Sequence, residues 1–224
     1  MLNKRDMIQR LSQYRSVLQK LKGLGLVRVF SDNLADALGI SASLARKDLA
    51  QLQLSGQKRG GYQVDPLLER LNEILGKHER QRLVIAGCGK IGRALIDYNN
   101  FRQDDIQIVA GFDVDPNLIN TAAPVPIHDV AELGDFVRRE QIEVAIIATP
   151  DNAAGRIFEQ LKESGVRGVL NFAPVQLKSS EACVVQNLHL REEIEQLFYL
   201  VHFMKRHNGA PETAAPAPKK GKRK

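Results

Sequence analysis

The segment Gly87-Cys-Gly-Lys-Ile-Gly92 carries glycines at the spacing that binds the pyrophosphate group of a dinucleotide. It directly follows an apolar stretch at residues 83–87 that is typical of a buried strand, and it begins a predicted helix over residues 91–99. In that position the glycines permit a tight turn, a close approach of backbone to phosphate and close packing of helix on strand, while the helix N-terminus attracts the phosphate charge. The segment therefore predicts a dinucleotide site, and a purely structural glycine turn is the alternative.

An acid stands at the end of the next predicted strand, residues 108–113. Asp113 is placed to accept a hydrogen bond from a ribose hydroxyl, and the following Val114 and Asp115 offer no cation for a 2′-phosphate. This pattern favours NAD(H) over NADP(H) as the cofactor. Cys88 is interpreted as a small filler of the turn, and a redox-active thiol with a pKa lowered by the helix N-terminus is the alternative.

Two further segments follow predicted strands at residues 142–149 and 168–172, and thus lie at the edge where open α/β sheets bind ligands. They border a nicotinamide ring in one interpretation and are ordinary proline- and asparagine-containing loops in the other. The candidate cofactor residues from these patterns are Gly87, Cys88, Gly89, Lys90, Ile91, Gly92, Asp113, Val114, Thr149, Pro150, Asn171, Phe172, Ala173 and Pro174.

The elements that position these residues alternate between strand and helix, with helical stretches at residues 131–140 and 153–164. Such alternation predicts an α/β fold with a Rossmann-like, doubly wound parallel sheet. We assign this Rossmann NAD(H)-binding domain to residues 79–187.

A second pattern occupies residues 1–78 and predicts a winged-helix DNA-binding domain. Apolar residues recur at alternate steps of four and three from Met7 to Leu21, Ser31 is in position to cap a helix that runs to Leu38, and Ser41 caps a third that runs to about Leu52. Gly39 supplies the turn between them. Residues 55–62, which are rich in glycine and basic residues, fit the wing, and a helix opening at residues 65–66 buries Leu67, Leu68, Leu71, Ile74 and Leu75.

Basic residues gather on this first domain. Residues 1–80 carry a net charge of +6, residues 81–208 carry −4 and residues 209–224 carry +4. In a helix-turn-helix the third helix enters the major groove, where arginine reads guanine edges and lysine holds phosphate. A solvated surface is the alternative interpretation. The candidate DNA-binding residues are Ser41, Ser43, Arg46 and Lys47 on that helix, and Lys58 and Arg59 in the wing.

The C-terminal part contains a helix and a tail. Residues 188–207 place Leu190, Ile194, Leu197, Val201 and Met204 on one narrow seam, which suits pairing with a second helix and predicts a homodimer. Residues 208–224 contain no large apolar residue and are expected to form a disordered basic tail. That tail is either a solvated solubility segment or a non-specific DNA-binding arm.

Several classes of protein are excluded by composition. The apolar runs fall far short of the about 18 residues of a membrane span, and the N-terminus lacks the apolar core of a signal peptide, so we expect a cytoplasmic protein without a membrane partner. Cys88 and Cys183 form no metal-ligand motif with the five histidines, so we expect no metal site. His128 and His189 stand alone, without the partners that catalysis needs.

Taken together, these segments resemble the Rex family of redox-sensing transcriptional repressors. The matching segments cover nearly the whole chain: Val27-Arg-Val with Ser31, Arg46-Lys-Asp-Leu49, Lys58-Arg-Gly-Gly-Tyr62, Gly87-Cys-Gly-Lys-Ile-Gly92, Phe112-Asp-Val-Asp-Pro116 and Asn171-Phe-Ala-Pro-Val175. The resemblance implies a homodimer that binds a palindromic operator in double-stranded DNA, binds NADH or NAD+ in its Rossmann domain, and swaps its C-terminal helix into the partner. It also implies that NADH releases the repressor from DNA.

The resemblance adds Tyr98 to the cofactor-site candidates, because it matches a residue of that family's interdomain switch. At the other switch positions this chain has Ser16 and His189, where the family usually has arginine and an acid. We therefore expect a repressor rather than an enzyme. The alternatives are an NAD-dependent dehydrogenase with a small helical accessory domain, and a module that binds a nucleotide without responding to it.

Overall fold

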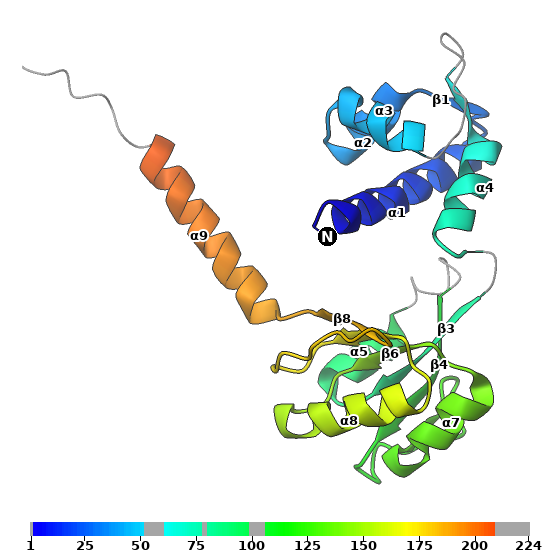
Figure 1. The fold of residues 1–224 in the computed structure, drawn as a ribbon, viewed down its shortest axis with the longest axis vertical. Coiled ribbons are helices and arrows are strands. Elements are labelled where there is room, and N and C mark those ends of the chain that lie inside the picture. The colour runs from blue at the N-terminus through cyan, green and yellow to red at the C-terminus, as the bar shows by residue number, and fades with distance from the viewer. Residues whose placement is uncertain (1, 52–60, 78–79, 99–105, 209–224) are drawn as a thin grey trace, which may run out of the picture. The chain divides into compact units, whose positions relative to one another are not determined.

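The computed structural model describes residues 2–51, 61–77, 80–98 and 106–208 (Figure 1). The chain divides into two compact units, one containing the N-terminal helices and the other the large sheet. Within the described residues, no helix is long and apolar enough to cross a membrane.

The first unit is built on a long helix, α1 (Leu2–Gly23), which packs against α2 (Ser31–Leu38) and α4 (Val64–Ile74). The seam predicted from the sequence is its buried face, because Leu11, Tyr14 and Leu18 are almost fully buried. Most other members of this core come from the helices that follow, and they include Leu34, Leu49 and Leu71. Ile74 was expected to be buried but is exposed, since it is the last residue of α4.

Helix α2 and helix α3 (Ala42–Gln51) form the predicted helix-turn-helix. Gly39 ends α2 in the left-handed conformation at φ 66°, which favours glycine. Ser41 caps α3, because its Oγ accepts a hydrogen bond from the Leu44 amide at 3.2 Å. The expected Ser31 cap was wrong by one position: Phe30 precedes the helix, and its amide donates to Asn33 Oδ1 at 3.0 Å.

A buried ion pair joins α1 to α3. Asp48 is 2% exposed, and its carboxylate accepts hydrogen bonds from Arg10 Nε at 2.6 Å and Arg10 Nη2 at 2.9 Å. Tyr14 Oη adds a third bond at 3.1 Å, and burial together with the Asp48 charge raises the pKa of this phenol. The bidentate pair fixes the rotation of α3 about its own axis.

Two short strands complete the winged-helix arrangement. β1 (Arg28–Val29) pairs antiparallel with β2 (Tyr62–Gln63), so that the strand before α4 lies beside the strand before α2. The predicted wing residues Lys58 and Arg59 lie outside the described residues.

The second unit contains a six-stranded sheet in the order β5-β4-β3-β6-β7-β8. Its strands are β3 (Gln81–Ala86), β4 (Ile106–Asp113), β5 (Ile127–Asp129), β6 (Val144–Ile147), β7 (Gly168–Asn171) and β8 (Val184–Asn187). Numbered along the chain, this order is 3-2-1-4-5-6, the Rossmann order, and it reverses direction between β3 and β6. The sequence predicted four of these strands, and it missed the edge strands β5 and β8.

Helices cover both faces of the sheet. Helix α5 (Lys90–Asp97) connects β3 to β4, whereas α8 (Asp151–Glu163) connects β6 to β7 in the opposite direction, so right-handed crossovers place them on opposite faces. Helix α7 (Leu133–Glu140), which follows the short 3-10 turn η1 (Val130–Glu132), packs beside α8 (Figure 1). Their apolar sides bury the central strands in one core.

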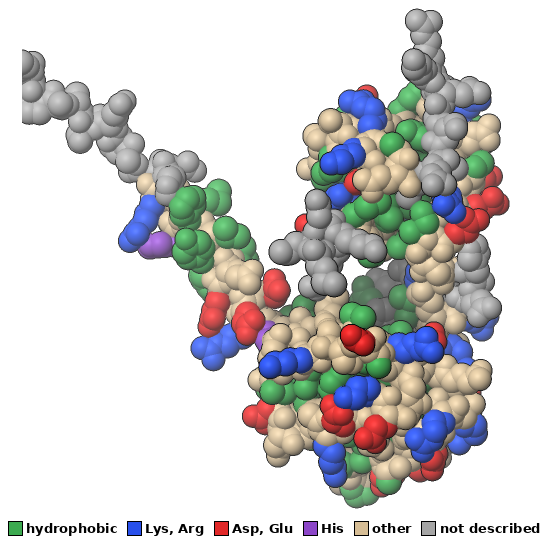
Figure 2. Space-filling model, viewed as in Figure 1, with side chains coloured by type: hydrophobic (Ala, Val, Ile, Leu, Met, Phe, Trp, Pro, Cys, Tyr) green, Lys and Arg blue, Asp and Glu red, His purple; other side chains and the backbone are tan. Residues whose placement is uncertain are grey.

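The last described element is α9 (Leu190–Asn208), at the position where the sequence predicted a helix. All the residues of its predicted seam are exposed in the single chain. Figure 2 shows hydrophobic side chains gathered along the C-terminal half of this helix.

The ion pair between α1 and α3 generates a stability prediction. Asp48→Ala should destabilise the protein by about 2 kcal/mol, because it removes the buried acceptor of the charged hydrogen bonds from Arg10, whose side chain is 19% exposed and still reaches water. Tyr14→Phe removes one hydrogen bond only and should cost about 1 kcal/mol. Urea unfolding followed by circular dichroism measures both; equal losses would contradict a dominant role for the Arg10–Asp48 pair.

Candidate functional site

The glycine-rich turn after β3 is shaped by contacts too close for any side chain. A Cβ on Gly92 would lie 1.9 Å from the carbonyl oxygen of Gly87, and a Cβ on Gly87 would lie 2.6 Å from the backbone of Ala148. Gly87 also has a φ of 94°. Gly89 differs, because the space beside its Cα is open. The first and third glycines therefore serve the packing of turn and helix, and the second leaves room for a ligand.

Asp113 closes the other side of this turn. Its Oδ2 accepts a hydrogen bond from the Cys88 amide at 2.6 Å, and its Oδ1 accepts one from the Asp115 amide at 3.0 Å. Each carboxylate oxygen keeps a further lone pair for a ligand hydroxyl. Burial, with a smaller contribution from the Asp113 charge, raises the pKa of the Cys88 thiol to about 11. Cys88 is therefore a neutral thiol at pH 7, as expected of a filler.

A cavity of about 540 Å³ lies at the carboxyl ends of the central strands, beside the N-terminus of α5. Most of the predicted cofactor residues line it. They are Gly87, Gly89, Lys90, Ile91, Asp113, Val114, Thr149, Pro150, Phe172 and Pro174. The structure thus brings together residues from four separate loops, at the point where the strand order reverses.

Thr149 lines this cavity and carries a polar atom without a partner in the described part of the chain. Its Oγ1 is buried and has no hydrogen-bond partner among the described residues. A buried hydroxyl without a partner is costly unless a ligand or water satisfies it. The open face of Gly89 leaves room for a ligand that lies across the turn, and either that ligand or a water molecule would have to supply the partner of this hydroxyl.

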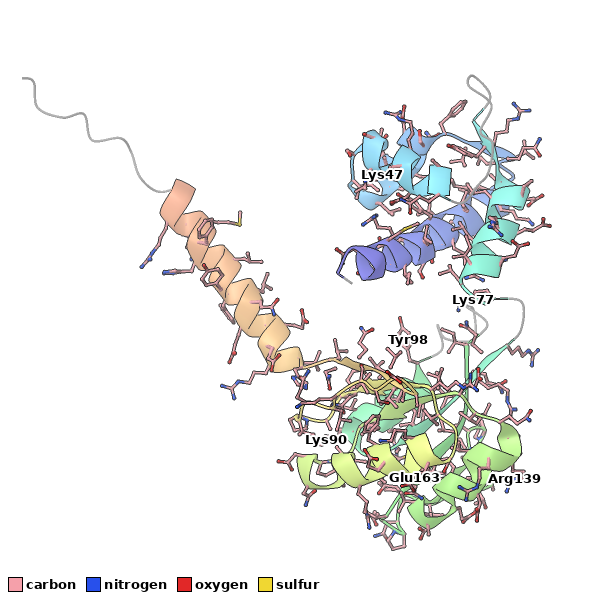
Figure 3. All side chains as sticks on the ribbon, viewed as in Figure 1. Lys47, Lys77, Lys90, Tyr98, Arg139 and Glu163 are labelled. Carbon is pink, nitrogen blue, oxygen red and sulfur yellow. The ribbon has the colours of Figure 1, made fainter. Side chains whose placement is uncertain are left out.

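The other predicted cofactor residues do not line the cavity. Cys88 and Gly92 are buried beneath the turn. Tyr98 follows α5 and lies at the opposite end of that helix from Lys90 (Figure 3). Asn171 and Ala173 alternate with Phe172 and Pro174 in the same segment, but they are buried, and only Phe172 and Pro174 line the cavity.

Asn171 has a structural role that its position in the motif did not reveal. Its Nδ2 donates to the carbonyl of Val175 at 2.7 Å and to Asn187 Oδ1 at 2.8 Å, and its Oδ1 accepts from the Ala173 amide at 3.0 Å. These bonds occupy the side-chain amide of Asn171 and fix the conformation of the loop after β7.

Sequence reasoning missed several cavity residues, most of which belong to no motif. Ala153, Arg156 and Ile157 line the cavity from one face of α8, at the spacing of neighbouring helical turns, and Phe112, Leu118 and Val130 add apolar surface. The helical spacing in α8 is the one signal that could have found the first three.

The predicted DNA-binding residues that the structure describes lie on α3. Ser43, Arg46 and Lys47 are exposed, while Ser41 is occupied as the cap of the helix. Arg46 forms an ion pair with Asp32 of α2. Lys47 (Figure 3) makes no ion pair within the described part of the chain, so its charge is available for phosphate.

The cavity fits a dinucleotide. The helix N-terminus and the open Gly89 suit a pyrophosphate, Asp113 suits a ribose, and the apolar surface suits the ring systems. In the described residues, no group of three His, Cys, Asp or Glu side chains could hold a metal ion. A helix-turn-helix and a dinucleotide cavity in one chain define the class of ligand-responsive DNA-binding regulators.

Comparisons with known proteins identify the family. Residues 5–50 match the family described as "Putative DNA-binding protein N-terminus", and residues 78–175 match the "CoA binding domain" family. A redox-sensing transcriptional repressor Rex of Clostridium botulinum is 35% identical over 196 residues, which cover 87% of this chain and 93% of that protein. The chain belongs to the Rex family of redox-sensing transcriptional repressors.

Solved structures agree with this assignment. The repressor RSP in complex with β-NAD+ and operator DNA has a TM-score of 0.82 and 29% identity, covering 94% of this chain and 98% of that one. RSP in complex with β-NADH has a TM-score of 0.76 and 27% identity, covering 91% and 96% of the two chains. The α/β fold with an N-terminal DNA-binding domain is confirmed, and the dehydrogenase alternative is rejected, because the relatives are repressors and not enzymes.

The unpartnered hydroxyl of Thr149 generates a prediction. Thr149→Val should leave thermal stability unchanged or slightly higher, because the hydroxyl has no protein partner to lose. It should weaken NADH binding by roughly 2- to 12-fold, the equivalent of one hydrogen bond. Calorimetric titration with NADH measures the affinity, and Thr149→Ser, which keeps the hydroxyl, is the control. Equal affinities for the Val variant and the unmodified protein would show that Oγ1 does not touch the cofactor.

Proposed function

We propose that this protein is a transcriptional repressor that binds palindromic operator DNA and senses the NADH/NAD+ ratio, with NADH releasing it from DNA. The observation that carries the proposal is the presence, in one chain, of an exposed basic recognition helix and an apolar cavity over a glycine-rich turn. Related RSP structures contain β-NAD+ with operator DNA in one case and β-NADH in another, which supports both ligands for this chain.

The cofactor NAD(H) would bind across the glycine-rich turn. In this proposal the amides at the start of α5 hold the pyrophosphate, and Asp113 accepts from the adenosine ribose. Thr149, Pro150 and Phe172 border the nicotinamide ring. The remaining members of the predicted set, including Asn171 and Ala173, act by holding the loops in place.

The chemistry of the ring end favours the reduced cofactor. Oxidised and reduced forms differ by one positive charge on the nicotinamide, and the surface that Pro150, Phe172 and Pro174 offer is apolar. A charge buried there loses solvation without compensation. We therefore expect NADH to bind more tightly than NAD+.

The DNA contacts would come from α3 and from the wing. Arg46 reads guanine in the major groove, and Lys47 holds the phosphate backbone. Lys58 and Arg59 are assigned to the backbone from their place in the sequence alone. Since operator DNA is the partner, this proposal places the protein in the cytoplasm.

The helix α9 would form a homodimer. Besides the predicted seam, Phe198, Tyr199, Leu200 and Phe203 are also exposed, so the C-terminal half of the helix is apolar around most of its circumference. A helix of this kind needs cover on more than one side. A second copy of the chain supplies that cover and gives the two-fold symmetry that a palindromic operator requires.

Substitution within α9 tests the dimer. Leu197→Glu with Val201→Glu should convert the protein to monomers, because each change places a charge in the expected apolar interface. Sedimentation velocity measures the mass, and Glu195→Gln on the polar side of the same helix is the matched control. A double variant that still sediments as a dimer would remove α9 from the interface.

The coupling between cofactor and DNA tests the proposed function as a whole. A typical allosteric coupling of about 1 to 3 kcal/mol corresponds to roughly 5- to 150-fold weaker operator binding with saturating NADH. We expect the lower end, because Ser16 and His189 replace the family's switch residues and both have local partners, Ser12 O at 3.2 Å and Glu192 Oε1 at 3.0 Å.

The measurement is operator affinity with and without NADH, together with NADH affinity with and without operator, on a site selected from random-sequence duplexes. Linkage requires the same factor in both directions. Unchanged affinities in both titrations would reduce the protein to a constitutive DNA-binding protein with a nucleotide site.

A further inference from the structure

Arg46, the residue expected to read bases, is held by a carboxylate on the neighbouring helix. Its Nη1 lies 3.2 Å from Asp32 Oδ1, and the two side chains are 58% and 66% exposed. Ser31 Oγ donates to the same Oδ1 at 3.4 Å. A solvated ion pair contributes little to folding stability. Stability therefore does not account for a partner at this position.

The direction of Arg46 is set from inside the unit. Asp48, two residues further along α3, is clamped by Arg10 of α1, and Ser41 fixes the start of the helix. Because the rotation of α3 is fixed, the Cα–Cβ bond of Arg46 is fixed too. The freedom that remains lies in the torsions of its long side chain, and Asp32 restricts those torsions.

The ion pair leaves the recognition edge of Arg46 free. Nη1 donates to Asp32, whereas Nε and Nη2 donate to no group in the described part of the chain. Bidentate contact with a guanine uses two N–H donors of one guanidinium, directed at O6 and N7. The Nε and Nη2 edge offers these two donors in parallel.

We propose that Asp32 is a specificity-determining residue of the DNA-binding unit, which positions Arg46 for a guanine edge and competes with phosphate for its charge. The inference rests on the proposed DNA-binding function. Without Asp32, Arg46 would be free to bind backbone phosphates on DNA of any sequence. The Asp32 carboxylate makes the free energy of such a phosphate contact less favourable, because the guanidinium already has a negatively charged partner. Asp32 acts through Arg46 and touches no base itself.

The chain offers a matched control on the same helix. Asp36 lies one turn along α2 from Asp32, is exposed and makes no ion pair within the described residues. Asp32→Asn and Asp36→Asn each remove one negative charge from α2. Both should therefore raise the affinity for random-sequence DNA, because the repulsion of the phosphate backbone falls. Only Asp32→Asn should change the discrimination between sequences.

The experiment measures the affinity of the full chain for a selected operator and for a random-sequence duplex of equal length, at one fixed salt concentration. The ratio of the two affinities should fall roughly two- to fivefold further for Asp32→Asn than for Asp36→Asn, the range of an exposed ion pair. In the Arg46→Ala background the two variants should give the same ratio, because the group that Asp32 positions is gone. Circular dichroism checks that all the variants fold.

The outcomes separate the inference from the function on which it rests. Equal ratios for the two variants in the unmodified background would overturn the role of Asp32 and leave the repressor function intact. If the ratios for Asp32→Asn and Asp36→Asn still differed in the Arg46→Ala background, the role of Asp32 would also be overturned, because Asp32 would then act through a group other than Arg46. An unmodified protein that binds operator and random DNA alike would overturn the proposed function, and the inference with it.

Discussion

The second unit depends on a contact that only glycine permits, between the third glycine of the turn and the carbonyl of the first. A Cβ at position 92 would lie only 1.9 Å from Gly87 O. Because Gly92 has none, α5 can begin directly against β3. That approach places the amides at the start of the helix beside the carboxyl edge of the sheet, where the connections that follow β3 and β6 run in opposite directions. The cavity, its apolar surface and the position of Asp113 all follow from this arrangement of strand, turn and helix.

The N-terminal unit achieves comparable precision with a polar contact. Apolar packing alone leaves a short helix some freedom to rotate, because leucine and alanine side chains fit several arrangements. The carboxylate of Asp48 removes that freedom, since its bidentate bond with Arg10 has one geometry. The cost is a buried charge pair that adds little net stability. Placement of α3, rather than net stability, is what this pair provides.

The sequence predicted those features that rest on short-range rules. The glycine spacing, the Ser41 cap and the apolar steps of α1 each reflect local geometry, so the fold class and most of the cavity could be inferred. The edge strands β5 and β8 were missed because they lack the buried apolar residues that mark the central strands: β5 has one buried residue and β8 has none. Arg156 was missed because its contribution depends on which face of α8 meets the cavity. Asn171 could be located but its contacts could not, because its partner Asn187 is distant in the chain.

The hydrogen bonds of Asn171 also connect two parts of the molecule mechanically. One side chain spans the loop that carries Phe172 and the end of β8, and the backbone carbonyl of Asn171 accepts from the Leu188 amide at 2.8 Å. Two residues later the chain enters α9. A displacement of this loop by a bound ring would therefore pass through only a few hydrogen bonds before it reached the start of α9. The stiffness of this hydrogen-bonded bridge would set how much of a movement in the cavity reaches α9.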